Sequence, residues 1–216
     1  MKKAFYSFIY YRLLGWKTNV TVPDYDKCVI CAAPHTSNWD LFIGKLFYGA
    51  IGRKTSFMMK KEWFFFPLGL IFKAVGGIPV NRGRKSSLVD QMTEKFANSK
   101  HFHLAITPEG TRKANPNWKK GFYYIALKAQ VPIMLIGIDY PSKTISSTKA
   151  VMPTGDIEKD NAALDAYFLS LPNAGSFRRV YVNCDNNLLN LRRNGESWQV
   201  VLIDEEMKKR MFEDAE

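Results

Sequence analysis

The stretch 27-KCVICAAPHTSNWDLF-42 contains the change of pattern that decides the fold of this chain. Residues 27–33 form a short apolar run typical of a buried strand, and the run ends at Pro34. Three small polar residues that favour helix starts, residues 36–38, come next. The apolar residues after them predict a helix over about residues 38–50. A strand that passes directly into a helix is typical of an α/β protein.

The alternation of strands and helices continues along the chain. Strands are predicted over residues 55–60, 78–81, 102–107 and 132–140, and helices over residues 86–98 and 121–129. Pro67, Gly69 and the Gly76-Gly77 pair interrupt the apolar stretch between the second and third strands. We therefore expect one α/β domain with a mixed, largely parallel sheet flanked by helices.

Three segments are expected along the chain. The polar motifs that follow the predicted strands fall within residues 21–177, which we assign to the α/β domain, and residues 1–20 form a separate N-terminal helix. Residues 178–216 form a C-terminal extension with a turn at Asn194-Gly195 and a charged, helical end. No function is assigned to that extension.

Charge is distributed unevenly over the 216 residues, whose net charge is +11. Residues 1–130 hold 21 Lys and Arg residues against 7 Asp and Glu residues, whereas residues 131–216 hold 10 against 13. A basic surface of this kind attracts phosphates in small substrates, anionic lipids or nucleic acids. No helix-turn-helix, zinc-finger or RNA-binding sheet motif is visible, so nucleic acid is not an expected partner.

The N-terminus, MKKAFYSFIYYRLLGWK, combines cations with bulky apolar and aromatic residues. It lacks a small-residue cleavage site and Arg12 interrupts it, which argues against a signal peptide. The composition suits a helix that lies in a membrane interface, and the alternative is a core helix packed on the domain. No apolar run is long enough to predict a membrane-spanning helix.

Cysteine and histidine pairs offer two further candidate sites. Cys28 and Cys31 form a C-x-x-C, but at the period of a strand they point to opposite faces, which argues against a redox or metal pair. His101 and His103 share a face of a predicted strand and lack a third ligand. No metal site is therefore expected. Three cysteines predict a reducing compartment.

His35 and Asp40 are the candidate catalytic residues. On one helix they would lie about 140° apart and could not touch. They can meet if His35 sits in the turn before the helix and Asp40 in its first turns. The carboxylate would then accept the Nδ1 proton and leave Nε2 free as a base. The alternative is a capped helix start with an incidental histidine.

Two more polar clusters follow predicted strands directly. Asn81 and Arg82 come after the strand at 78–81, with Arg84 and Lys85 close behind, and the segment 109–112 follows the strand at 102–107. Ligands of open α/β sheets bind outside the carboxyl ends of the strands, so the three clusters could converge on one cleft. An arginine such as Arg112 suits bidentate recognition of a phosphate.

These residues together resemble the motifs of the glycerolipid acyltransferases, in particular the lysophosphatidic acid acyltransferase branch. His35 and Asp40 match the H-x-x-x-x-D motif of that family, and the segments 77-GIPVNR-82, 108-PEGTR-112 and 131-VPI-133 resemble its other three motifs, in the family's order. The resemblance covers about residues 27–140. It departs at Pro79 and Thr107, where the family commonly has an aromatic residue, which leaves the identity of the acceptor open.

The resemblance implies a role for each matched residue. His35 deprotonates an acceptor hydroxyl that attacks an acyl thioester, and Asp40 orients His35. The substrate-binding residues are Asn81, Arg82, Glu109, Gly110, Thr111 and Arg112. Arg82 and Arg112 bind the acceptor phosphate, and Glu109 positions the acceptor or an arginine. The sequence has no G-x-S-x-G nucleophile elbow, which agrees with direct attack.

The expected activity is transfer of a fatty acyl group from a thioester of acyl carrier protein or coenzyme A to a lysophospholipid. The first choice of acceptor is 1-acyl-glycerol-3-phosphate, giving phosphatidic acid, and the alternative is a lyso-aminolipid or another amphipathic hydroxyl compound. A more distant alternative is a non-catalytic basic module that binds membranes or nucleic acid. The enzyme would need no cofactor. It would work on an anionic membrane surface, at the cytoplasmic face of the inner membrane, and the stretch 63-WFFFPLGLIF-72 would dip into lipid, line an acyl tunnel or lie in the core.

Overall fold

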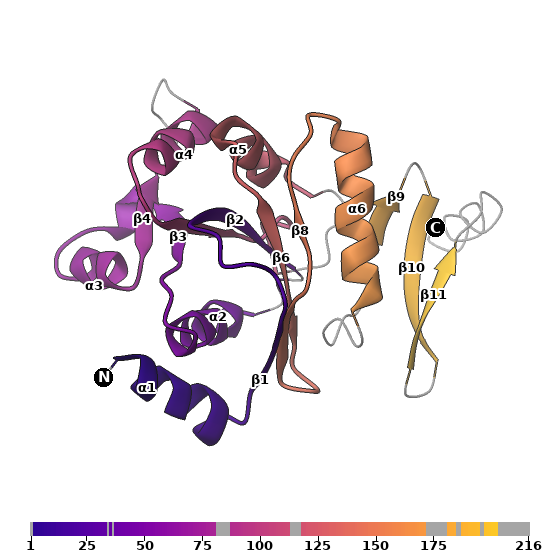
Figure 1. Cartoon of the computed structure of the whole chain (residues 1–216), viewed down its shortest axis with the longest axis horizontal. Helices are drawn as coiled ribbons and strands as arrows, with labels where there is room; N and C mark the ends of the chain where they lie inside the picture. The colour runs from indigo at the N-terminus through magenta and orange to yellow at the C-terminus, as the bar shows by residue number, and fades with distance from the viewer. Residues whose placement is uncertain are drawn as a thin grey trace, which may run out of the picture.

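The computed structural model describes residues 2–33, 35, 37–80, 87–112, 118–171, 181–184, 187–194 and 197–202. Figure 1 shows a central sheet with helices on both faces. The sheet has eight strands in the order β1-β7-β6-β2-β5-β3-β4, with β8 also paired to β6. These strands are β1 Lys17–Val20, β2 Lys27–Ala32, β3 Ser56–Lys60, β4 Gly77–Val80, β5 Phe102–Ile106, β6 Ile133–Asp139, β7 Thr144–Ser147 and β8 Ala150–Val151.

Most neighbouring strands of this sheet run parallel. β2 pairs in parallel with β5 and β6, β3 with β4 and β5, and β1 with β7. Only β7 and β8 run antiparallel to β6. The predicted mixed, largely parallel sheet is therefore confirmed. Because β2 to β6 point the same way, the loops after them gather along one edge of the sheet.

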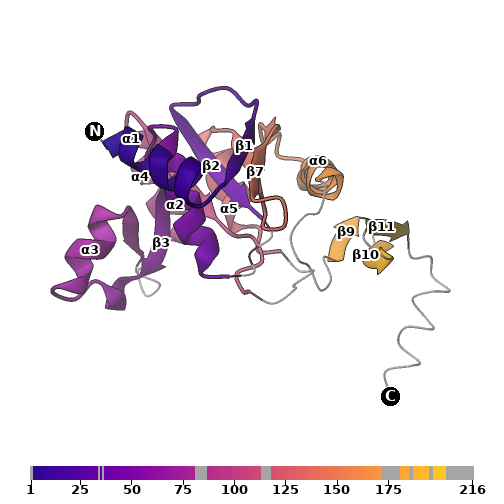
Figure 2. The same ribbon diagram turned by 90° about the horizontal axis from the view of Figure 1, so that it is seen from below.

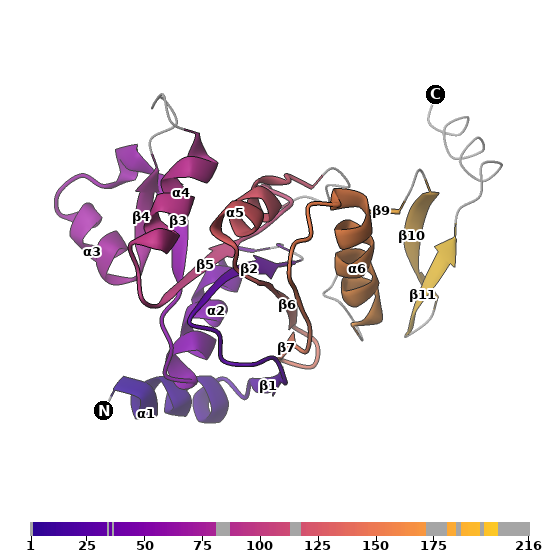
Figure 3. The same ribbon diagram turned by 45° about the horizontal axis from the view of Figure 1, so that its top comes forward.

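The central strand β2 shows how the two faces are filled. Val29 and Cys31 belong to one buried cluster, whereas Cys28 and Ile30 belong to the other. Helices α4 (Leu88–Ala97), α5 (Gly121–Ala129) and α6 (Ile157–Ser170) cover the first cluster, and α2 (Trp39–Ala50) covers the second (Figure 3). The two cysteines lie on opposite faces, as the period of a strand predicts.

Local sequence signals determine where several helices begin and end. α4 starts with a reciprocal pair of hydrogen bonds between Ser87 and Asp90, which form a capping box. α6 starts at Asp156, whose carboxylate accepts the backbone N–H of Lys159 at 3.1 Å. α5 ends at Gln130, which adopts a left-handed conformation with φ of 53°.

The N-terminal segment packs along α2. It consists of α1 (Lys2–Ser7), followed by π-helical turns over Phe8–Leu13, and both Figure 1 and Figure 2 draw α1 beside α2. The Ser7 hydroxyl donates to the carbonyl of Ala50 at 3.0 Å, and the Tyr10 side chain is fully buried. A Cβ on Gly49 would lie within 2.5 Å of the Tyr6 ring, so glycine permits this close approach.

One face of the N-terminal segment is thus part of the core, and its chain continues into β1 of the main sheet. The opposite face exposes Phe5, Phe8 and Leu13. The buried face agrees with the alternative of a core helix, whereas the membrane-interface role and the boundary at residue 20 stay predictions. Within the residues that the structure describes, no helix is both long and apolar enough to cross a membrane.

Several elements lie where no regular structure was predicted. A 3₁₀ turn over Lys61–Trp63 and the short helix α3 (Leu68–Ala74) connect β3 to β4, between the interrupting Pro67 and Gly76. β7, β8 and α6 occupy residues to which the sequence assigned no element. Beyond them, β9 (Tyr181–Cys184), β10 (Asn187–Asn194) and β11 (Ser197–Leu202) form an antiparallel sheet, and the predicted terminal helix lies outside the described residues.

Candidate active site

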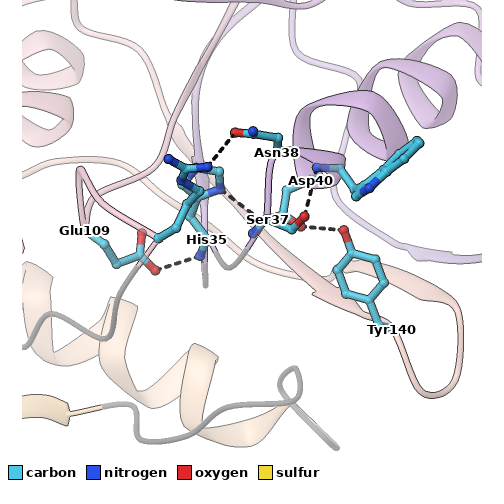
Figure 4. Close-up of polar contacts among 8 residues, drawn as sticks. His35, Ser37, Asn38, Asp40, Glu109 and Tyr140 are labelled. Carbon is cyan, nitrogen blue, oxygen red and sulfur yellow. Dashed lines mark hydrogen bonds and ion pairs between the residues drawn. The ribbon is translucent and has the colours of Figure 1, made fainter.

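The loops that follow β2 and β5 meet at the carboxyl edge of the sheet. The backbone N–H of His35, after β2, donates to Oε1 of Glu109, after β5, at 3.0 Å (Figure 4). The pairing of β2 with β5 runs from Lys27 and Phe102 to Cys31 and Ile106, so the two loops leave the sheet side by side. Two of the three polar clusters expected at strand ends are thus brought together.

His35 and Asp40 form a hydrogen-bonded pair. His35 Nδ1 lies 2.9 Å from Asp40 Oδ2, with His35 in the turn before α2 and Asp40 in its first turn. This is the arrangement under which residues five apart were expected to be able to meet. The carboxylate is 7% exposed and the imidazole 20% exposed, so the histidine is the more accessible member of the pair.

The start of α2 fixes the orientation of the Asp40 carboxylate. The backbone N–H of Ser37 donates to Asp40 Oδ2 at 3.0 Å, and the Ser37 hydroxyl accepts the N–H of Trp39 at 3.2 Å. The Asp40 carboxylate thus satisfies the backbone N–H of Ser37, and the Ser37 hydroxyl satisfies that of Trp39. The Tyr140 hydroxyl donates to Asp40 Oδ1 at 2.5 Å.

These contacts determine the tautomer of His35. An ionised carboxylate only accepts hydrogen bonds, and the N–H of Ser37 and the hydroxyl of Tyr140 both donate to Asp40. The proton between Asp40 and His35 therefore belongs to Nδ1 of the ring. Nε2 then carries the lone pair, which is the arrangement that a general base needs.

Glu109 is a buried acid beside this pair. Its side chain is 5% exposed, and burial raises its pKa, an effect that the hydrogen bonds it accepts oppose. The negative charge of Asp40 raises the Glu109 pKa further. Glu109 thus holds the backbone of His35 from the other side of the cleft. Its burial favours the neutral form of the carboxyl group over the charged form, relative to a carboxyl group in water.

The same loop presents Arg112 and Gly110 at the surface. The Arg112 guanidinium is exposed and donates to Asn38 Oδ1 at 3.3 Å, which directs it toward the helix entry that holds Asp40. Thr111 is exposed beside it. Gly110 has a φ of 62°, and a Cβ there would lie 2.9 Å from the Lys119 side chain, so the turn requires glycine.

The other predicted binding residues, Asn81 and Arg82, lie outside the described residues, as do Arg84 and Lys85. The strand that leads to them is described. β4 ends at Val80 at the same edge of the sheet as β2, and the Val80 side chain borders the cavity described next.

An apolar cavity of about 610 Å³ opens beside the His35–Asp40 pair. It lies where β3 and β5 separate, because these two strands pair only at Ser56–Leu104 and Phe57–Ala105. Helix α2 contributes Gly44 to its wall. Its apolar lining includes Leu41, Phe57, Met58, Ala105, Phe122 and Ile136.

Lys45 is one of three lysines in the wall of the cavity, with Lys60 and Lys119. Its Nζ donates to the carbonyl of Thr55 at 2.6 Å, and burial lowers the pKa of the amine. The carbonyl bond satisfies one of the three N–H groups of this ammonium. The wall is otherwise dominated by the apolar side chains named above.

The two histidines near β5 have separate environments. His101 precedes the strand, is exposed and pairs with Asp26, so the prediction that it shares a strand face with His103 is wrong. His103 is buried, bonds through Nε2 to the carbonyl of Tyr25, and has a pKa lowered by burial. Across the described ranges, no three His, Cys, Asp or Glu side chains are grouped so that they could hold a metal ion.

Residues 17–139 match the acyltransferase family, and this match covers more than half of the 216 residues. The chain belongs to the acyltransferase family. The matched segment runs from β1 to the end of β6, and so includes His35, Asp40 and the loop after β5. The sequence resemblance to acyltransferases is confirmed.

Two curated relatives carry the same activity in their names. The chain is 33% identical over 104 residues to 1-acyl-sn-glycerol-3-phosphate acyltransferase beta of Homo sapiens, covering 45% of this chain and 37% of that protein. It is 31% identical over 106 residues to 1-acyl-sn-glycerol-3-phosphate acyltransferase of Cocos nucifera, covering 46% and 33%. The match thus spans about a third of the length of these relatives.

A solved structure has a similar fold. The 1-acyl-sn-glycerophosphate (LPA) acyltransferase PlsC from Thermotoga maritima superposes with a TM-score of 0.53 over 76% of each chain, at 18% sequence identity. At this identity the comparison supports the fold alone. The α/β acyltransferase architecture predicted from the motifs agrees with it.

Sequence reasoning missed Tyr140. It lies directly after β6, and 100 residues separate it from the Asp40 carboxylate that its hydroxyl contacts. No local motif marks this tyrosine. Its place at the very end of a predicted strand, residues 132–140, was the available signal, since β6 is parallel to β2 and ends at the same edge.

Proposed function

We propose that this protein transfers a fatty acyl group from a thioester to the free hydroxyl of 1-acyl-glycerol-3-phosphate, giving phosphatidic acid. The observation that carries the proposal is the His35–Asp40 pair, oriented for base catalysis at the mouth of an apolar cavity. The names of the two relatives favour this acceptor.

The reaction needs one base and no covalent intermediate on the protein. Nε2 of His35 takes the proton of the acceptor hydroxyl while its oxygen attacks the thioester carbonyl carbon. A carbon–oxygen bond forms, the carbon–sulfur bond breaks, and the leaving thiolate takes the proton back from the imidazolium. Asp40 stabilises that imidazolium and keeps Nδ1 protonated throughout.

The loop after β5 supplies the groups that suit a phosphate. Arg112 is exposed at the helix entry that holds Asp40, and its planar guanidinium fits a phosphate with two parallel hydrogen bonds. Arg82 and Asn81, in the loop after β4, are proposed to bind the same acceptor. Glu109, Gly110 and Thr111 shape the loop that presents Arg112.

The apolar cavity suits the chain of the acyl donor. Its volume of about 610 Å³ is enclosed by side chains from both faces of the sheet, and it reaches the imidazole that activates the acceptor. An acyl chain lying there would bring its thioester to His35. The donor is proposed to be acyl carrier protein or coenzyme A carrying the acyl group, with no further cofactor.

Two exposed apolar surfaces suit the membrane that holds such substrates. One is the outer face of the N-terminal segment, with Phe5, Phe8 and Leu13; the other surrounds α3 and exposes Phe65, Phe66, Leu70 and Ile71, with Phe66 82% exposed. Figures 1 to 3 draw α1 and α3 at the end of the molecule where the N-terminus lies.

Cations accompany both of these surfaces. Lys2, Lys3 and Arg12 flank the first, and Lys60, Lys61 and Lys73 flank the second, all exposed. Apolar groups bordered by cations fit the interface of an anionic bilayer. We propose a peripheral position on such a membrane, at the cytoplasmic face.

A lyso-aminolipid is the second candidate acceptor, because Pro79 and Thr107 stand where glycerolipid acyltransferases commonly have an aromatic residue. Thr107 borders the cavity beside Gly110, which places this departure next to the proposed acceptor loop.

An acceptor panel tests the proposal. Purified protein in anionic liposomes receives an acyl thioester with either 1-acyl-glycerol-3-phosphate, a lyso-aminolipid or a phosphate-free lysolipid, and mass spectrometry identifies the products. Phosphatidic acid as the main product is expected. Preferential acylation of the aminolipid would replace the acceptor, and absence of thioester consumption with every acceptor would favour a non-catalytic binding module.

A further inference from the structure

Tyr140 contacts the one oxygen of Asp40 that faces away from the catalytic histidine. Its hydroxyl donates to Oδ1 at 2.5 Å, whereas His35 Nδ1 and the N–H of Ser37 both contact Oδ2 (Figure 4). The carboxylate is thereby held through both oxygens. Rotation of its plane would break contacts on both sides, so the orientation of Oδ2 toward the imidazole is fixed.

The Tyr140 ring is itself held by the N-terminal part of the chain. The buried Trp16 side chain meets it edge to face, with ring centroids 5.4 Å apart and planes at 82°. The backbone beside both residues is tied as well, since the N–H of Lys17 donates to the carbonyl of Lys143 at 2.7 Å. The packing of the Tyr140 ring therefore fixes the position of its hydroxyl relative to Asp40.

The hydroxyl of Tyr140 is protonated at neutral pH. Burial, and then the hydrogen bond to Asp40, raise the pKa of Tyr140 well above its ordinary value. A protonated phenol acts as the hydrogen-bond donor toward the Asp40 carboxylate. It withdraws negative charge from Asp40 without becoming charged itself, which weakens the attraction of Asp40 for a proton on His35.

We propose that Tyr140 is a positioning residue for the His35–Asp40 pair, which sets the orientation of the carboxylate and moderates the basicity of the imidazole. The expected effect on kcat rests on the proposed function. The expected effect on the His35 imidazole rests only on the contacts of Asp40 with Tyr140 and His35. Among the described residues, the other charged groups near His35 or in the cavity that it borders are Glu109 and Arg112 from the loop after β5, Lys119 before α5, Lys45 of α2 and Lys60 of β3. Replacing Tyr140 by phenylalanine alters none of them.

Tyr140→Phe is the matched variant, because it removes one hydroxyl and keeps the ring against Trp16. The expected result is a fall in kcat of about tenfold, the size expected for one hydrogen bond to a charged group, with KM for both substrates unchanged. The acidic limb of the kcat/KM profile is expected to move to higher pH, because Asp40 then stabilises the imidazolium more strongly.

Tyr167→Phe is the control. Its buried ring also loses a bonded hydroxyl, which donates to the carbonyl of Ser146 at 3.1 Å on the far side of the sheet from α2. This variant is expected to keep the wild-type kcat and pH profile. An equal fall in kcat in both phenylalanine variants, or a wild-type profile in Tyr140→Phe, would overturn the proposal.

A second readout does not depend on turnover. NMR titration of the His35 imidazole is expected to give a higher His35 pKa in Tyr140→Phe and a lower one when 3-fluorotyrosine, a stronger donor of the same shape, replaces Tyr140. If the protein transfers no acyl group, the proposed function fails while this titration still tests Tyr140. An unchanged His35 titration in the fluorinated protein, which keeps the native contacts, overturns the role of Tyr140.

Discussion

Glu109 Oε1 lies 3.0 Å from the backbone nitrogen of His35, so a buried carboxylate holds the main chain of the proposed catalytic base. Burial raises the pKa of Glu109, and the fold therefore favours its protonated form. Such a group stabilises the fold most at low pH. Its contribution is lost as the pH rises from the unfolded value, about 4.3, through the raised folded value.

Glu109→Gln should remove this pH-dependent loss. The amide oxygen can still accept the N–H of His35, and the variant carries no charge to bury. We expect the variant to gain stability relative to wild type as the pH rises through that window, measured as the free energy of unfolding in urea at a series of pH values. Glu62→Gln, an exposed control, should follow the wild-type curve. A constant difference between Glu109→Gln and wild type at all pH values would contradict the assignment.

Arg112→Ala should weaken binding of the phosphate-bearing acceptor. A hydrogen bond to a charged group is worth about 1.5–3 kcal/mol, which corresponds to a rise in KM of about ten- to a hundredfold. The KM of a phosphate-free acceptor should stay unchanged. Arg53→Ala removes an arginine that pairs with Asp24 at 2.7 Å, away from the cleft, and should leave both KM values as in wild type. Equal losses for both acceptors in Arg112→Ala would refute phosphate binding.

Gly44 allows a graded test of the cavity. It lies on α2 in the cavity wall, and a Cβ at this position would meet no atom within 4 Å. Gly44→Ala and Gly44→Leu should therefore fold, and alanine should stabilise the helix by about 0.5–1 kcal/mol. The leucine side chain would fill part of the space proposed for the acyl chain.

The expected result for Gly44→Leu is a preference for donors with shorter chains, with an intermediate effect in Gly44→Ala. Competition between acyl thioesters of different length, with products resolved by mass spectrometry, measures this preference. A leucine variant that folds and keeps the wild-type chain-length profile would show that the acyl chain lies elsewhere.

Membrane binding should depend on both exposed apolar surfaces. Replacing Phe66 and Leu70 together by serine removes two side chains that each gain up to about 1.5–3 kcal/mol when fully buried. Because the two side chains would be only partly buried in the membrane interface, we expect a loss of affinity for anionic vesicles of at least about tenfold. Sedimentation with vesicles measures this affinity. The matching pair Phe5→Ser and Phe8→Ser should have a similar effect.

Tyr124→Ser is the control for these two pairs, because Tyr124 is an exposed aromatic residue of α5, on the opposite face of the sheet from α2. Deleting residues 1–16 would test the surface less cleanly, since the deletion also removes the buried Tyr10 and Trp16. Wild-type sedimentation of both serine pairs would exclude these surfaces as the membrane contact.

The sequence predicted the elements that carry the site because their signals are local. The apolar run that ends at Pro34 and the polar residues after it mark the turn from β2 into α2, and with this turn the five-residue spacing allows the observed His35–Asp40 contact. Parallel strands bring distant motifs to one edge, so Glu109 beside His35 also followed from the pattern.

Contacts that depend on tertiary packing were not predictable in this way. Tyr140 reaches Asp40 only because β6 lies next to β2, and that neighbourhood depends on strand order. The packing of one face of the N-terminal segment in the core could not be predicted for a similar reason. Its aromatic residues suit lipid and protein interior equally well, and only the packing of Tyr10 on Phe47 separates the two.

The most direct test of the account is turnover of an acyl thioester by His35→Ala with 1-acyl-glycerol-3-phosphate as acceptor. A positioned general base contributes roughly 10²–10⁴-fold, so we predict a loss of that size with the melting temperature and vesicle binding close to wild type. His101→Ala, which changes an exposed histidine paired with Asp26, should retain full activity. A folded His35→Ala variant that forms phosphatidic acid at the wild-type rate would contradict the mechanism.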